Sequence, residues 1–303
     1  MQFKRIKRPV SGVFLLDKPV GFSSNQALQQ VKRLYQAEKA GHTGSLDPFA
    51  TGLLPICLGE ATKFSHFLLD ADKTYRATLC LGVTTTTGDT EGEVLSSVIV
   101  NVTRDAMERA VAQFKGDIRQ VPPMYSALKH EGKPLYEYAR AGIEIERPAR
   151  DVTIHDIVLE EMTGNVAVIK VSCSKGTYIR TLAEDIGKVL GCGAHLTQLR
   201  RLETGGFTLA EAMTLEQLES MTLEQRDSVL LPADDLIGNL PAVVLDSESA
   251  YYLGRGQSVW KSGQIPEGFL RLYEVPDRFL GLGELDADGK VAPRRLVVYE
   301  KVN

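Results

Sequence analysis

The strongest chemical signal in this chain is one carboxylate, Asp47, inside the segment that spans residues 40–55. Three glycines in this segment permit positive φ angles or a close approach of neighbouring backbone, and Pro48 restricts the backbone directly after the acid. Leucine and phenylalanine side chains flank Asp47, so we expect the loop to pack against the core. A carboxylate in a rigid, partly apolar loop can act as a nucleophile, a base or a ligand. An Asx-turn, in which the side chain bonds its own backbone before the proline, is the structural alternative.

Five stretches of the chain resemble the motifs of one enzyme family and follow in the family order. They are LDKPVG at 16–21, GHTGSLDPFATGLLP at 41–55, KTYR at 73–76, GTYIRT at 176–181 and GAHLTQLRR at 193–201. The family is that of the tRNA pseudouridine synthase B (TruB) enzymes, and the resemblance spans roughly residues 12–205. It implies an isomerase that converts the uridine at position 55, in the T arm of tRNA, to pseudouridine.

The chemistry of this reaction explains why one acid is enough. The N1–C1′ bond breaks, the base turns over and C5 joins C1′, so no redox equivalent, hydrolytic water or metal is needed. The resemblance assigns the nucleophile or charge stabiliser to Asp47. Burial of an isolated carboxylate raises its pKa, and the resemblance names Arg180 as the cation that keeps Asp47 ionised. Without the resemblance, a surface arginine on a helix is the favoured interpretation of Arg180.

The resemblance also implies a pocket that holds a flipped uracil. Tyr75 is expected to be catalytic and, with Tyr178, to stack on the base. The Tyr75 hydroxyl can relay the C5 proton, although a phenol with a pKa near 10 is a weak base. Leu199 is expected to form the apolar wall. Read alone, each of these three residues is consistent with ordinary core packing.

Two further residues are expected to contact the substrate. His42 takes the place of the flipped nucleotide or stacks on a neighbouring base. Lys18 supports the active-site loop or meets a phosphate, and a plain turn lysine is its alternative.

Composition limits the classes of protein to consider. The chain has 303 residues, of which 43% are hydrophobic and 24% charged, which is typical of a globular protein with one large and one small domain. The four cysteines are widely spaced and the five histidines form no HxxxH or HxH pattern. We therefore expect reduced thiols and no metal. The chain shows neither a signal peptide nor an apolar run of membrane-spanning length, so we expect a cytoplasmic protein. We also expect a monomer that needs no cofactor and no obligate protein partner.

The net charge of −4 does not by itself favour a nucleic-acid partner, but the charges are unevenly distributed. Residues 203–250 carry ten acids and one base, whereas residues 1–40 carry eight bases and two acids. This distribution predicts a basic face that attracts phosphate. Ordinary solvated surface charge is the alternative.

The apolar patterns predict an α+β fold. The resemblance implies the pseudouridine synthase fold, a mixed, largely antiparallel curved sheet with flanking helices. We expect a small C-terminal β domain after it, which the resemblance identifies as PUA type. Strands are predicted at 13–17, 73–83, 152–159 and 166–173, helices at 24–35, 61–69, 103–114, 136–141 and 178–190, and helical turns at 214–230. Residues 84–92 are predicted to be a loop, and Thr177 or Thr181 is expected to cap the helix at 178–190.

We divide the chain into a catalytic domain at 1–230, a linker at 231–249 and a PUA-like RNA-binding domain at 250–303. Residues 116–150 within the first domain are predicted to be an RNA-gripping insertion, because basic and aromatic side chains alternate there with prolines and glycines. Aromatic rings stack on bases and cations meet phosphates. A surface loop that ends in a short helix is the alternative.

Three other functions are compatible with parts of the pattern. A non-catalytic RNA-binding or RNA-folding protein is disfavoured by the presence of Asp47, Tyr75 and Arg180 together. A relative that depends on a guide RNA is expected to carry longer terminal extensions. A hydrolase built on Asp47 lacks a recognisable metal set or histidine partner.

Overall fold

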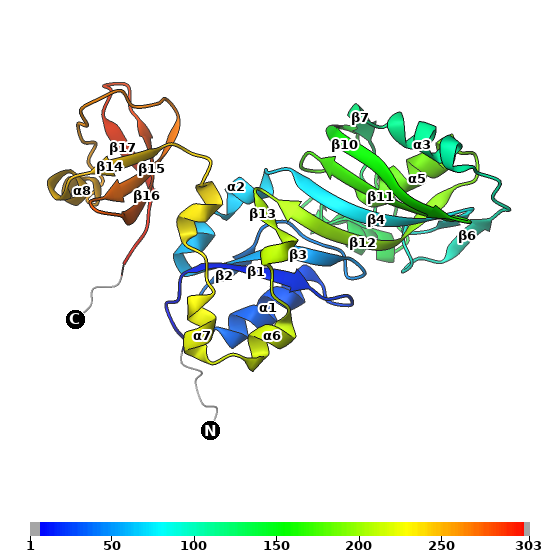
Figure 1. The fold of residues 1–303 in the computed structure, drawn as a ribbon, viewed down its shortest axis with the longest axis horizontal. Helices are drawn as coiled ribbons and strands as arrows, with labels where there is room; N and C mark the ends of the chain where they lie inside the picture. Colours follow the sequence, from blue (N-terminus) through cyan, green and yellow to red (C-terminus); the bar gives the residue numbers. More distant parts are fainter. Residues whose placement is uncertain (1–6, 300–303) are drawn as a thin grey trace.

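The computed structural model describes residues 7–299, which form a large body around one sheet and a small body around another (Figure 1). The strands of the large sheet are β1 (Gly12–Lys18), β2 (Ala40–His42), β3 (Thr51–Leu58), β4 (Lys73–Leu81), β7 (Gly116–Gln120), β10 (Arg150–Thr163), β11 (Val166–Cys173), β12 (Ala194–Thr204) and β13 (Phe207–Thr208). Their order is β1-β3-β12-β4-β11-β10-β7, with β2 paired to β3 and β13 paired to β12. Only the short β12–β3 pairing within this sheet is parallel, which confirms the mixed, largely antiparallel sheet.

Helices cover the large sheet at both ends (Figure 1). The helical segments of the large body are α1 (Ser24–Leu34), η1 (Gly59–Lys63), α2 (Ser65–Leu69), α3 (Arg104–Ala112), α4 (Leu135–Arg140), α5 (Ile179–Val189), η2 (Leu209–Glu211), α6 (Leu215–Ser220), α7 (Leu223–Ser228) and η3 (Ala233–Ile237). α1 and α6 pack near β1 and β3, whereas α3 and α5 pack on β10 and β12. Ser23 and Gln26 form a capping box that starts α1, and the helix turns Ala27 and Val31 into the core.

The C-terminal sheet has its own small core. It contains β14 (Ala242–Leu245), β15 (Phe269–Glu274), β16 (Arg278–Leu285) and β17 (Val291–Leu296) in that order, and α8 (Ser247–Leu253) packs against it. Alternate residues Val243 and Leu245 of β14 are buried against Leu270 and Leu272 of β15. The predicted α+β architecture with a small C-terminal β domain is therefore confirmed.

Three stretches differ in detail from the sequence expectation. The helix expected at 61–69 is divided into η1 and α2, because the backbone of Phe64 at the junction departs from helical geometry with φ −108°. The expected loop at 84–92 begins inside a short hairpin of β5 (Val83–Thr85) and β6 (Val94–Ser97). A short hairpin of two-residue strands, β8 (Lys129–His130) and β9 (Lys133–Pro134), lies within 116–150.

The stretch expected to be a linker, 231–249, contains η3, β14 and the first residues of α8. Pro232 and Pro241 suggested a connection without regular structure. Residues 242–245 instead pair with β15 and bury alternate apolar side chains in the C-terminal core. Leu236 and Ile237 of η3 are buried in the cluster that contains Phe64.

The small domain is docked on η1 and α2 by apolar and polar contacts. The rings of Phe64 and Phe279 meet edge to face with centroids 5.5 Å apart. Lys63 Nζ donates to the carbonyl of Leu296 at 2.8 Å, and Glu60 accepts from the Val298 amide at 2.6 Å. No helix within residues 7–299 is long and apolar enough to cross a membrane.

The close approach of β3 to β12 gives a stability prediction. Gly52 has φ +102°, and a Cβ there would lie 2.3 Å from the carbonyl oxygen of Arg201. Replacement of Gly52 by Ala should lower the free energy of unfolding by about 3 kcal/mol or more. Gly164, at the β10–β11 turn, has φ +60°, and a Cβ there would meet nothing within 4 Å, so Gly164→Ala should cost only about 1 kcal/mol. If urea unfolding showed equal losses of free energy for the two variants, the proposed steric clash between a Cβ at Gly52 and the Arg201 backbone would be contradicted.

Candidate active site

One cavity of about 260 Å³ collects most of the residues singled out in the sequence. It lies between the loop after β2, the strands β4 and β12, and the start of α5. Five of the seven predicted site residues line it: Asp47, Tyr75, Tyr178, Arg180 and Leu199. Lys18 and His42 are not part of its lining.

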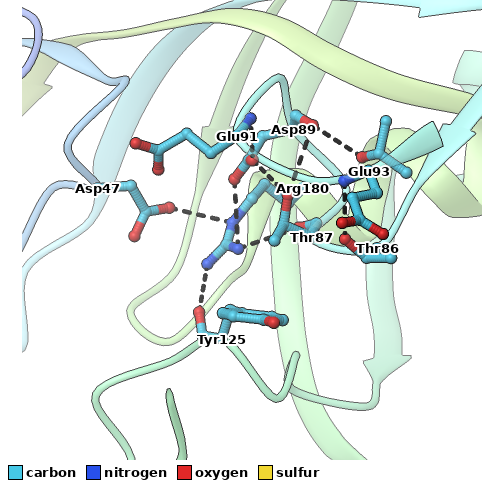
Figure 2. A network of polar contacts seen from close by, with 9 residues as sticks. Asp47, Thr86, Thr87, Asp89, Glu91, Glu93, Tyr125 and Arg180 are labelled. Atoms are coloured by element: carbon cyan, nitrogen blue, oxygen red, sulfur yellow. Dashed lines mark hydrogen bonds and ion pairs between the residues drawn. The ribbon is translucent and has the colours of Figure 1, made fainter. Parts of the chain in front are cut away.

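The loop that carries Asp47 is held down by buried polar side chains. The Ser24 hydroxyl accepts from the Leu46 amide at 2.7 Å and donates to the Leu46 carbonyl at 3.0 Å. The Asp47 carboxylate points to Arg180 and not to its own backbone (Figure 2). The Asp47 side chain therefore forms an ion pair with Arg180 and not the Asx-turn that was the alternative expected from the local sequence.

Lys18 lies beneath this loop and is completely buried. Its ammonium donates to the carbonyls of Pro19 at 2.8 Å and Phe22 at 2.6 Å, and it lies 3.5 Å from that of Pro48. Burial lowers the pKa of Lys18 to about 8, while the nearby Asp47 carboxylate opposes the shift. The contacts of Lys18 are therefore those of a support for the loop.

Arg180 joins three separate segments through one guanidinium (Figure 2). Nε lies 3.0 Å from Asp47 Oδ2, Nη1 donates to the Thr87 carbonyl at 3.0 Å, and Nη2 donates to the Tyr125 carbonyl at 2.6 Å. Nη1 also lies 3.4 Å from Asp89 Oδ2. The Arg180 side chain is 5% exposed and that of Asp47 is 39% exposed, so a ligand in the cavity can reach the acid but hardly the arginine.

Two carboxylates thus share one guanidinium, and this sets the charge of the site. Burial raises the pKa of Asp47 above its ordinary value, Arg180 opposes that shift, and Asp89 adds to it. Burial together with Asp89 and Asp47 also raises the pKa of Glu91. The sequence reading missed Asp89, whose only signal was its place in a threonine-rich loop.

The two central strands bring Tyr75 and Arg201 directly opposite each other in register. Arg201 is 1% exposed, and it donates to the carbonyls of Leu53 at 2.7 Å and Gly44 at 3.2 Å, on either side of Asp47. Burial raises the pKa of Tyr75, and Arg201 opposes this shift. Arg201 stands inside a recognised motif, but the sequence alone did not distinguish it from its neighbours.

His42 lies on β2, outside the lining of the cavity. Its Nδ1 is buried without a hydrogen-bond partner. Burial, and to a lesser extent Arg201, lowers the pKa of His42, so the imidazole is neutral at pH 7. Among the described residues, no group of three or more His, Cys, Asp or Glu side chains is arranged to hold a metal ion.

Comparison with known proteins identifies the fold as that of a pseudouridine synthase. A family profile described as TruB family pseudouridylate synthase (N terminal domain) matches residues 32–179. Profiles described as tRNA pseudouridylate synthase B C-terminal domain and Pseudouridine synthase II TruB, C-terminal match residues 180–250 and 241–297. The chain belongs to the TruB family of pseudouridine synthases, and it is an isomerase. The resemblance inferred from the five motifs is confirmed.

Curated relatives are similar over almost their full lengths. A protein of Methylobacillus flagellatus named tRNA pseudouridine synthase B is 64% identical over 98% of both chains. One of Pseudomonas aeruginosa with the same name is 55% identical over 98% of this chain and 99% of its own. A chain in the crystal structure of a Cbf5-Nop10-Gar1 complex is 26% identical, with a TM-score of 0.69 over 95% of this chain and 84% of that chain.

The raised pKa of Asp47 predicts an unusual stability effect. A higher pKa in the folded state means that folding favours protonated Asp47, so the ionised acid opposes folding above that pKa. Asp47→Asn should therefore not lower the thermal unfolding midpoint at pH 7, and any gain should shrink as the pH falls through the pKa of Asp47.

Asp156→Asn is the matched control, because its hydrogen bond to Lys115 lowers the pKa of the exposed Asp156. Asp156→Asn should therefore lower the thermal unfolding midpoint at pH 7, and this loss should fade at low pH. A clear loss of stability in Asp47→Asn at pH 7 would mean that the Arg180 ion pair outweighs burial.

Proposed function

We propose that this protein isomerises the T-arm uridine of tRNA, position 55 in tRNA nomenclature, to pseudouridine. The curated relatives named above carry the name tRNA pseudouridine synthase B and match this chain over almost its whole length. The observation that carries the proposal is the Asp47–Arg180 pair, whose reachable carboxylate faces a cavity that two tyrosines also line.

Asp47 is the nucleophile or charge stabiliser of the reaction. It acts on the nucleotide while the N1–C1′ bond breaks, and the same sugar carbon then bonds to C5 of the rotated base. C5 loses one proton and N1 gains one, so no external reactant is consumed. Arg180 opposes the effect of burial and keeps the acid available in its ionised form.

Tyr75, Tyr178 and Leu199 hold the detached base. Because burial raises the pKa of Tyr75, its phenol is protonated at neutral pH. It stacks on the uracil or passes the C5 proton through its hydroxyl, and it does not act as a free phenolate. A cavity of about 260 Å³ cannot admit a stem, so the target nucleotide has to leave its stack and enter alone. His42, on the strand that leads into the Asp47 loop, contacts the opened RNA.

The insertion at 116–150 grips the RNA. Two of its tyrosines lie under cations: Lys133 Nζ is 4.8 Å from the ring of Tyr138, and the Arg140 guanidinium carbon is 5.4 Å from that of Tyr136. Such pairs offer a base a stacking surface next to a phosphate contact. The C-terminal domain supplies a second, PUA-like RNA contact, and the protein acts in the cytoplasm as a monomer without a cofactor or metal.

The decisive assay is incubation with an unmodified tRNA transcript in excess chelator, followed by position-resolved mapping of pseudouridine. A short T-arm hairpin that folds without magnesium separates any metal effect on tRNA folding from one on catalysis. Product at the T-arm uridine in both substrates is expected. Absence of product there, with the protein folded, would refute the proposed target.

Asp47→Asn should abolish product formation while RNA affinity stays close to that of the wild type, because the amide keeps the shape and loses the charge. Loss of such a group usually costs several powers of ten in rate, so we expect less than about a thousandth of the wild-type rate. Asp156→Asn, on the surface, should retain full activity. A residual rate well above that limit would exclude a nucleophilic role for Asp47.

The insertion gives a separate prediction about binding. Its composition suggests that it orders further on RNA, so limited proteolysis should cut the free protein between Lys129 and Arg140 and a bound T-arm hairpin should protect it. Deletion of residues 125–140 should weaken RNA affinity much more than it lowers the thermal midpoint. Unchanged affinity, or equal protection with and without RNA, would identify the segment as an ordinary rigid loop.

A further inference from the structure

The insertion leaves the large sheet next to the active site, and one glutamine marks the point. Gln120 is the last residue of β7 and lies opposite Arg150, the first residue of β10. The chain between these partners forms most of the insertion. Gln120 is only 2% exposed, so its side chain faces the protein and not the RNA.

The Gln120 side-chain amide makes a two-way contact with the backbone of Tyr178. The Tyr178 amide donates to Oε1 at 3.0 Å, and Nε2 lies 3.3 Å from the Tyr178 carbonyl that it donates to. Tyr178 is the residue before α5, and its own side chain does not cap the helix. Neither threonine expected to cap α5 does so, and the Thr177 hydroxyl donates instead to the Ser174 carbonyl. Gln120 thus fixes the backbone from which the Tyr178 and Arg180 side chains project.

A second contact connects the same two segments a few residues further along. Arg180 Nη2 donates to the Tyr125 carbonyl at 2.6 Å, five residues after Gln120. Ser126 and Ala127, the next residues of the insertion, line the cavity together with Tyr178. The contacts form a closed ring from Gln120 to Tyr178, through the first turn of α5 to Arg180, and back through Tyr125 to the insertion. A shift of the insertion therefore moves an acceptor of the guanidinium that pairs with Asp47.

We infer that Gln120 is a positioning residue that couples the RNA-gripping insertion to the Asp47–Arg180 pair. The inference rests on the proposed function of that pair and goes beyond it. Contact of RNA with the insertion holds Tyr125 in place, and Gln120 keeps the start of α5 aligned with it. Binding at the insertion then contributes to the rate of isomerisation as well as to affinity.

Gln120→Met tests this inference, since methionine has a similar length and neither amide group. With a T-arm hairpin, kcat should fall at least about tenfold while the dissociation constant changes less than about threefold. The acid limb of the pH profile of kcat should move to higher pH. Burial raises the pKa of Asp47, and a displaced Arg180 lowers that pKa less than Arg180 in its normal position. Gln113→Met is the matched control: that amide lies at the exposed end of α3, where it donates to the Arg109 carbonyl, and its loss should leave kcat and the pH profile unchanged.

Two further variants keep the test decisive. Gln120→Glu retains an acceptor for the Tyr178 amide and loses the donor, so it should fold and show a smaller loss of kcat. In an Arg180→Lys background, Gln120→Met should lower kcat by less than a further factor of about two, because the effects of residues that act through one another are not additive. Three results would overturn the inference. The first is an unchanged kcat and pH profile in both Gln120 variants, and the second is a double variant whose loss of kcat is the full product of the two single losses. The third is that Gln120→Met lowers only RNA affinity or only thermal stability.

The same assays separate this inference from the proposed function. Product at the T-arm uridine that depends on Asp47 but not on Gln120 refutes only the positioning role. Product that survives Asp47→Asn, or no product from the wild type, refutes the function on which it rests.

Discussion

The buried guanidinium of Arg180 is the interaction on which the rest of the site depends. A charge out of contact with water is tolerated only when its donors are satisfied. Here the partners come from the Asp47 loop, the threonine-rich loop at 84–92 and the insertion at 116–150. None of these segments carries much regular structure around its contact. The arginine at the start of α5 therefore organises them, and the geometry of the site follows from its need for acceptors.

The balance of charge around Arg180 suits the reactive role that we propose for Asp47. Asp47 and Asp89 both face the same guanidinium, so neither carboxylate is fully neutralised by a partner of its own. Burial and Asp89 raise the pKa of Asp47 while Arg180 holds it down. A carboxylate in this state remains available to an incoming ligand, whereas one locked in an exclusive bidentate pair would be less nucleophilic. The raised pKa of Asp47 means that its ionised form opposes folding, which is common where function and folding make opposite demands.

The Asp47 loop owes its shape to buried cations that bind backbone carbonyls. Lys18 and Arg201 each donate to carbonyls of the surrounding backbone, and neither has an ion-pair partner within residues 7–299 at the usual distance. Their positive charges lie near Asp47, and Lys18 lowers its pKa. Rigidity and a favourable potential for an anion thus come from the same side chains. The small domain, which carries the second proposed RNA contact, is docked on η1 and α2 through Phe64 and Phe279.

The amino-acid sequence by itself determined the family, the α+β class and the choice of Asp47, Tyr75 and Arg180 as candidate site residues, because these groups stand in contiguous motifs. Local periodicity likewise predicted β4, β11, α1 and α5, because apolar residues recur there at the spacing of a strand or of a helix. Only the tertiary structure revealed Asp89, Arg201 and Gln120, which are ordinary polar residues in the sequence. It also showed that 242–245 is a strand and that Asp47 and Asp89 share the Arg180 guanidinium. The physical reason is that hydrogen bonds, burial and charge balance depend on partners from distant segments, and no local pattern records which segments the fold brings together.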